Sequence, residues 1–84
     1  MGYIDSRKIL SLTDEFLASI GKKSEVDSAR SFFEGKMSNL GRSFDAGEVQ
    51  RGELAEKVSE LLKSFKIYLR SDELRALDKK FQYA

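Results

Sequence analysis

A helical stripe of apolar residues runs through the C-terminal half of the chain. Its members are spaced alternately four and three residues apart: Leu54, Val58, Leu61, Phe65 and Tyr68. This spacing is the period of one face of an α-helix. Proline, the strongest helix breaker, is absent from all 84 residues. The pattern therefore predicts a long helix, and its apolar face has to be covered by this chain, by a second copy or by a different molecule.

Three further segments with helical periodicity precede and follow the stripe. Gly21 is a natural C-terminal end for the first helix, Gly41 is a natural end for the second, and Ser71 can cap the last. The chain length corresponds to one domain at most. We therefore expect a single all-α domain over residues 1–84, a small compact bundle of about four helices in mostly antiparallel order. The expected helices span approximately residues 5–20, 25–40, 53–70 and 72–82.

The apolar face of helix 53–70 can be buried in one of two ways. The first two helices offer enough large apolar side chains to meet it, which favours a core formed within one chain. The alternating spacing of four and three also matches the seam of a coiled coil. A homodimer packed through helix 53–70 is therefore the structural alternative.

The amino-acid composition excludes most kinds of catalytic and metal-binding site. The chain contains no histidine and no cysteine, which are the usual ligands of zinc, copper and iron and the usual partners in nucleophilic catalysis. The loop at residues 45–56 has the length of an EF-hand, but Gly47 and Val49 stand where calcium needs oxygen ligands. We expect a protein that is not an enzyme and that has no cofactor, no metal site and no catalytic residue.

Charge and apolar runs indicate the compartment and the class of partner. The 15 basic and 14 acidic residues give a net charge of +1, whereas a domain that grips nucleic acid usually has a clear basic excess. The absence of cysteine suits a reducing compartment. No apolar run has the length of a membrane span, and the N-terminal segment is too charged for a signal peptide. We expect a cytoplasmic protein without a transmembrane segment.

The candidate contact residues lie on the predicted outward faces. On helix 53–70, Ile67 falls among three cations about 120–220° away from Leu54, at 100° per residue. This group is either a solvated face with one stray apolar residue or a contact patch. Phe32 on the second helix is either covered by the first helix or offered to a partner. Val49 in the following loop is an apolar residue without an obvious place. The predicted partner-binding residues are Phe32, Val49, Lys63, Lys66, Ile67 and Arg70.

These residues predict a function in binding. The leading hypothesis is a small helical interaction or regulatory protein, an adaptor or inhibitor, whose mixed apolar and basic patch binds another protein with an acidic surface. One alternative is a small nucleic-acid-binding regulator, which the near-zero net charge disfavours. The other is a self-protection protein, because the order of amphipathic helices is loosely similar to that of bacteriocin-immunity and antitoxin-type proteins.

Overall fold

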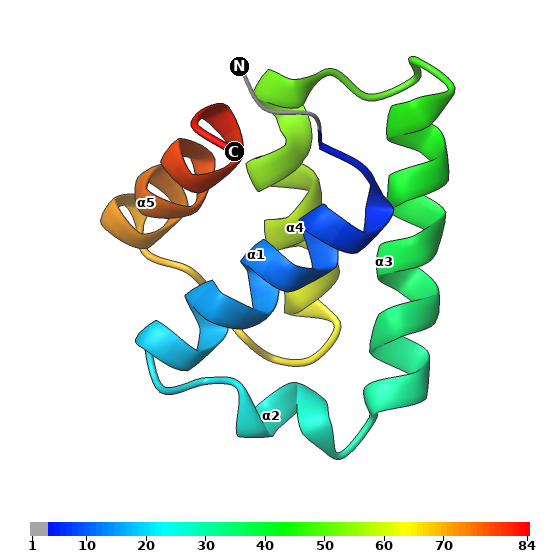
Figure 1. Ribbon diagram of the computed structural model, residues 1–84. Coiled ribbons are helices and arrows are strands. Elements are labelled where there is room, and N and C mark those ends of the chain that lie inside the picture. Colours follow the sequence, from blue (N-terminus) through cyan, green and yellow to red (C-terminus); the bar gives the residue numbers. More distant parts are fainter. Residues whose placement is uncertain (1–3) are drawn as a thin grey trace.

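The computed structural model describes residues 4–84, and these residues form only helices, turns and connecting segments (Figure 1). The predicted all-α bundle is confirmed. Four substantial helices alternate in direction along the chain, and a single-turn helix and a short 3₁₀ turn lie in the connections. The elements are α1 (Ser6–Ser19), α2 (Ser24–Asp27), α3 (Arg30–Asp45), the 3₁₀ turn η1 (Arg51–Glu53), α4 (Leu54–Lys63) and α5 (Ser71–Gln82).

The helices enclose a hydrophobic core to which every element except η1 contributes. Helix α1 packs mainly against α3, and α4 packs mainly against α5, while α1 also meets α5 (Figure 1). Leu54 and Val58 of the apolar stripe are buried, whereas Tyr68 is 68% exposed. The chain itself thus covers the N-terminal part of the stripe. The buried apolar residues are Ile4, Ile9, Phe16, Leu17, Val26, Phe33, Met37, Val49, Leu54, Ala55, Val58, Leu62, Ile67, Leu77 and Phe81.

Helix α1 begins and ends where the sequence predicts. The Asp5 side chain accepts a hydrogen bond of 2.9 Å from the backbone N–H of Lys8, which satisfies one of the free amides of the first turn. At the other end Gly21 has a φ of +72°. The backbone N–H of Lys22 then donates to the carbonyl of Leu17, which completes a Schellman motif.

The second predicted helix, 25–40, begins close to its predicted position, but it is interrupted and ends later than predicted. The chain forms the single turn α2, breaks at Ala29 with φ −125° and ψ 42°, and starts again as α3 at Arg30. Gly41 does not end α3, because the helix continues to Asp45. A Cβ built on Gly41 would lie 2.2 Å from the Cβ of Ser6 and 2.8 Å from its Cα. Gly41 therefore permits close approach of the N-terminus of α1 to α3.

The third predicted helix, 53–70, ends seven residues early. The backbone N–H of Ile67 donates to the carbonyl of Leu62 at 3.1 Å, and that of Lys66 donates to Lys63 at 3.0 Å. These bonds form a Schellman motif in which Lys66 occupies the left-handed position, with φ +62°. Ile67, predicted to face solvent, is instead 1% exposed. The turn reverses its direction, so that it joins Leu62 in the core.

Val49 is the second predicted contact residue that lies in the interior. Helix α3 ends at a third Schellman motif, in which Gly47 has a φ of +79° and the N–H of Glu48 donates to the carbonyl of Ser43. The chain after this turn runs back over the core, and Val49 is only 8% exposed. Its burial accounts for an apolar residue in a loop that is otherwise polar and glycine-rich.

Helix α5 begins one residue before its predicted start. Glu73 accepts a hydrogen bond of 2.9 Å from the backbone N–H of Arg70. This is one half of a capping box, because the side chain at the third helical position satisfies the amide that precedes the helix. Ser71 is the first residue of the helix and Arg70 is its N-cap, so the predicted cap at Ser71 is wrong, whereas the acidic residues after it lie in the first turn as the sequence indicates.

Candidate protein-interaction surface

The structure separates the six predicted contact residues into two groups. Val49 and Ile67 lie in the core and are therefore not available to a partner. Phe32 is 55% exposed, which is unusual for a side chain of this size and apolar character. Three cations are also exposed: Lys63, Lys66 and Arg70.

Arg70 differs from the two lysines because its charge is already opposed. Its guanidinium Nη2 lies 3.3 Å from Asp72 Oδ2, and its Nε lies 3.7 Å from Glu73 Oε1. Its backbone N–H also takes part in the cap of α5. In contrast, Lys63 and Lys66 make no ion pair with any residue in the range 4–84. Arg70 therefore belongs to the start of a helix, and the lysines remain free to meet external anions.

Phe32 is held in place by two aromatic rings and a cation. Its ring centroid lies 5.7 Å from that of Phe65 at an angle of 57°, and Phe65 in turn meets the buried Phe33 edge-on at 5.5 Å. On α3 itself the Lys36 ammonium lies over the Phe32 ring, 5.2 Å from the centroid. An exposed phenylalanine is thus tied to the core through Phe65.

These contacts define one surface cluster. We call Phe32, Lys36, Phe65 and Lys66 the aromatic–basic patch, since Lys66 directly follows Phe65 in the chain. The patch joins the N-terminal half of α3 to the turn after α4, and its two aromatic residues, Phe32 and Phe65, are 33 positions apart in sequence. Only the folded chain can bring them together.

A shallow groove extends from the patch along the outer face of α3. Phe32 and Lys36 line one end, Asn39 and Arg42 line the other, and Gly35 lies between them. The buried residues Phe33 and Met37 occupy the opposite side of the same helix. No carboxylate belongs to the groove lining in the described part of the chain. This α3 groove therefore presents one exposed aromatic ring and two cations.

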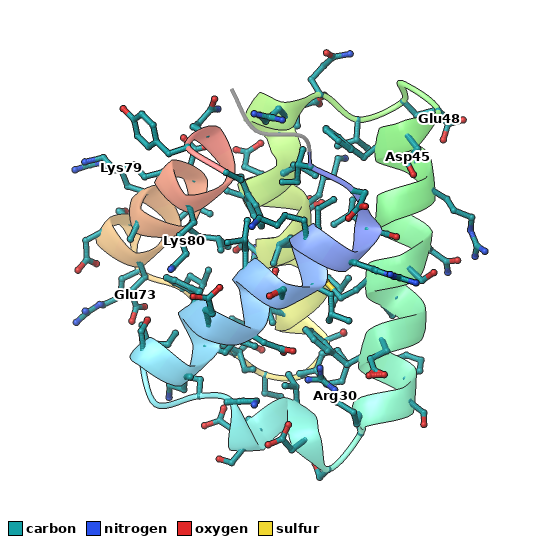
Figure 2. All side chains as sticks on the ribbon, in the orientation of Figure 1. Arg30, Asp45, Glu48, Glu73, Lys79 and Lys80 are labelled. Atoms are coloured by element: carbon teal, nitrogen blue, oxygen red, sulfur yellow. The ribbon has the colours of Figure 1, made fainter. Side chains whose placement is uncertain are left out.

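The inner edge of α3 shows the opposite electrostatic situation. Arg30, at the junction of α1, α2 and α3 (Figure 2), forms two hydrogen bonds with Asp14, of 2.9 and 2.5 Å. It also lies within ion-pair distance of Asp27 and Glu34. The hydrogen bond with Asp14 is the main cause that raises the pKa of Arg30 above its ordinary value. Arg30 is thus a structural cation, whereas Lys36 and Arg42 have no acidic partner within residues 4–84.

Sequence reasoning missed Lys36, Arg42, Gly35 and the role of Phe65. One available signal was the four-residue spacing of Phe32 and Lys36, which places an aromatic ring and an ammonium on the same helix face. No comparable signal existed for Phe65. Its helical period assigns it to the core, and its contact with Phe32 depends on how two distant segments pack.

Among residues 4–84, no helix has both the length and the apolar character that a membrane crossing requires. In the same range, no three acidic side chains gather in a way that could hold a metal ion. The chain matches no protein-family model, no curated protein and no solved structure.

Proposed function

We propose that this protein is a non-enzymatic adaptor or inhibitor that binds an acidic surface of another protein through the aromatic–basic patch. The observation that carries the proposal is the exposure of Phe32 combined with its fixed position. Phe65 supports its ring from the core side, and Lys36 lies over it. A side chain that is already ordered loses little conformational freedom when a partner covers it.

The charges around Phe32 support an acidic partner. Lys36 and Lys66 belong to the patch, and Lys63 lies three residues before Lys66 at the end of α4. None of these lysines is in an ion pair within the described residues. Such unopposed cations at the rim of an apolar contact increase the association rate with an acidic surface and select against basic ones.

The backbone of Lys66 gives a second reason to place the contact here. A left-handed conformation costs a residue with a Cβ about 1–3 kcal/mol, and glycine occupies the equivalent position at the ends of α1 and α3. Such strain is concentrated at functional sites in proteins. We interpret the lysine at this position as retained for its charge beside Phe65.

The remaining parts of the proposal concern chemistry and location. The sequence contains neither histidine nor cysteine, and this composition supports a binding function over a catalytic one. The lack of cysteine also supports a cytoplasmic site of action.

The test compares capture of partners by the wild-type chain and by surface variants. Both Phe32→Ser and Lys66→Glu are expected to reduce the amount of the same captured protein at least tenfold. The first variant removes the apolar anchor, and the second removes a charge that steers the acidic partner. Tyr83→Ser is the matched control for loss of an aromatic, because Tyr83 is 86% exposed and lies at the end of α5. Lys79→Glu is the matched control for charge reversal.

The captured protein is then purified and its direct binding to the same variants is measured by fluorescence anisotropy. Binding that survives Phe32→Ser and Lys66→Glu at wild-type affinity would refute the patch. A single-stranded oligonucleotide serves as the competing probe. If it binds more tightly than any captured protein at the same ionic strength, the nucleic-acid alternative replaces the proposal.

A further inference from the structure

We infer that the α3 groove receives an acidic amphipathic helix of the partner, aligned along α3. This inference rests on the proposed function and specifies the partner. The groove follows the helix axis from Phe32 to Arg42, a length of about 15 Å at a rise of about 1.5 Å per residue. About ten residues of a partner helix would cover the same length.

Gly35 gives the groove the shape that a second helix needs. Glycine weakens the interior of a helix, and at Gly35 neither backbone nor packing within this chain requires it. Its φ is not positive, and a Cβ built on it would meet no atom of residues 4–84 within 4 Å. Gly41, six residues later, shows what a helical glycine can do in this fold, because its missing Cβ lets Ser6 approach closely. Gly35 offers the same close approach on the outer face.

The positions of the charged residues specify the partner sequence. Lys36 lies about 6 Å beyond Phe32 along the axis, and Arg42 about 15 Å beyond it. On a partner helix running alongside, an apolar residue opposite Phe32 would be followed by carboxylates about four and about eleven residues away, which share one helix face. Asp45 and Glu48 lie at the C-terminal end of α3 (Figure 2), so the basic part of the surface ends near Arg42.

Charge also argues against a second copy of this chain. A symmetric contact through the groove would place Lys36 and Arg42 of one copy against the same cations of the other, and the described lining contains no carboxylate to offset them. Nucleic acid is disfavoured for a different reason. The chain has 15 basic and 14 acidic residues, so it lacks the basic excess of a domain that binds phosphates.

The experiment uses two synthetic peptides of equal composition as probes. One is an acidic amphipathic helix with a leucine and with glutamates four and eleven residues after it. The other contains D-amino acids at interior positions, which prevent the helix but keep the charge. Saturable chemical-shift changes confined to residues 31–42 and to the adjoining residues 65 and 66 of the ¹⁵N-labelled chain are expected with the helical peptide. The non-helical counterpart is expected to bind at least tenfold more weakly.

Variants of the chain test the geometry. Gly35→Leu is expected to weaken binding of the helical peptide at least tenfold, and Gly35→Ala only a few-fold, because the smaller side chain fills less of the groove. The double variant Lys36→Glu/Arg42→Glu is expected to lose the acidic peptide and to bind a lysine-substituted version. Lys79→Glu, on α5 and away from α3 (Figure 2), is expected to behave as the wild type.

The failure of this inference is distinguishable from that of the proposed function. Equal binding of both peptides, or no effect of Gly35→Leu, would overturn the helical partner, while dependence of the captured protein on Phe32 would leave the proposed function intact. Concentration-dependent dimerisation that Gly35→Leu abolishes would overturn the inference in favour of a second copy. Retention of the captured protein by Phe32→Ser would overturn both.

Discussion

Helix α3 and the segment from residue 54 to residue 70 differ in how their helical lengths relate to their sequences. Helix α3 contains Gly35 and Gly41, yet it runs unbroken for 16 residues. The segment 54–70 contains no glycine, and its apolar period continues to its end, yet α4 stops at Lys63. Local propensity alone would favour a break in α3 at its glycines and an unbroken helix over residues 54–70. The difference shows that packing against the rest of the chain decides where these helices end.

The packing that keeps α3 helical is the close approach to α1. A Cβ at Gly41 would overlap Ser6 at 2.2 Å, so the contact requires glycine even though glycine weakens the helix locally. Burial of Phe33 and Met37 on the same side of α3 offsets this cost. The helix therefore continues through a residue that usually ends one.

The packing that ends α4 is the burial of Ile67. In a continuous helix, Ile67 would point about 220° away from Leu54 and into solvent. The Schellman turn at Lys66 instead places Ile67 beside Leu62, both of which are essentially buried. Hydrophobic contact between these two positions commonly accompanies this motif. Burial of one large aliphatic side chain thus compensates for a strained backbone at Lys66.

The largest expected effect that tests this comparison comes from Ile67→Ala. Loss of the buried side chain is expected to destabilise the protein by about 2–5 kcal/mol, because it removes buried apolar area and leaves a cavity. The free energy of unfolding is measured by urea titration followed by circular dichroism. Tyr68→Ala is the control, since its side chain is mainly exposed. Equal losses for the two variants would contradict the assignment of Ile67 as the residue that ends α4.

The second expected effect is that of Gly41→Ala. Its Cβ would lie 2.8 Å from the Cα of Ser6, a backbone atom that cannot turn away, so α1 and α3 must separate. We expect destabilisation of about 1–3 kcal/mol. For a domain of this size, this corresponds to a fall of roughly 4–8 °C in Tm per kcal/mol. A neutral or stabilising result would show that α1 and α3 do not touch at this point.

The third prediction applies the same substitution to the other glycine of α3. Gly35→Ala is expected to stabilise the protein by about 0.5–1 kcal/mol, because alanine is a better helix former and its Cβ meets nothing within 4 Å. The melting temperatures of both variants are measured. The change in Tm relative to the wild type is expected to be positive for Gly35→Ala and negative for Gly41→Ala, although both replace a glycine of α3 by alanine. A loss of stability at Gly35 would indicate that this face is covered in solution.

The fourth prediction, comparable in size to that for Gly35→Ala, concerns Lys66→Gly. Glycine relieves the left-handed backbone at this position but also raises the entropy of the unfolded chain, so a net gain of about 0.5–1 kcal/mol is expected. Lys63→Gly is the control, because Lys63 has a helical backbone in the last turn of α4, and it is expected to lose about 1 kcal/mol. Chemical denaturation of both variants measures the difference. If Lys66→Gly also destabilised, the turn would not have the geometry described.

Features that depend on neighbouring residues were predictable for this chain. The start of α1 at Asp5, its end at Gly21 and the start of α5 near Ser71 each involve a few consecutive residues, and the predictions for them are confirmed. The candidate surface was only half predictable. The exposure of Phe32 and Lys63 follows from helical period, whereas Lys66 is exposed in a turn that the period does not predict. Ile67 and Val49 were placed outside because their burial depends on turns without a reliable local signal.

The sequence by itself determined the helical class of this protein, both ends of α1, the approximate start of α5 and the side-chain chemistry available to it. These properties follow from period, from short-range hydrogen bonding and from composition. Only the tertiary structure decided that Gly41 continues a helix, that Lys66 ends one and that Phe65 supports Phe32. Each of these depends on a contact with a residue far away in the chain or on the burial of a side chain in a shared core. No local pattern contains that information.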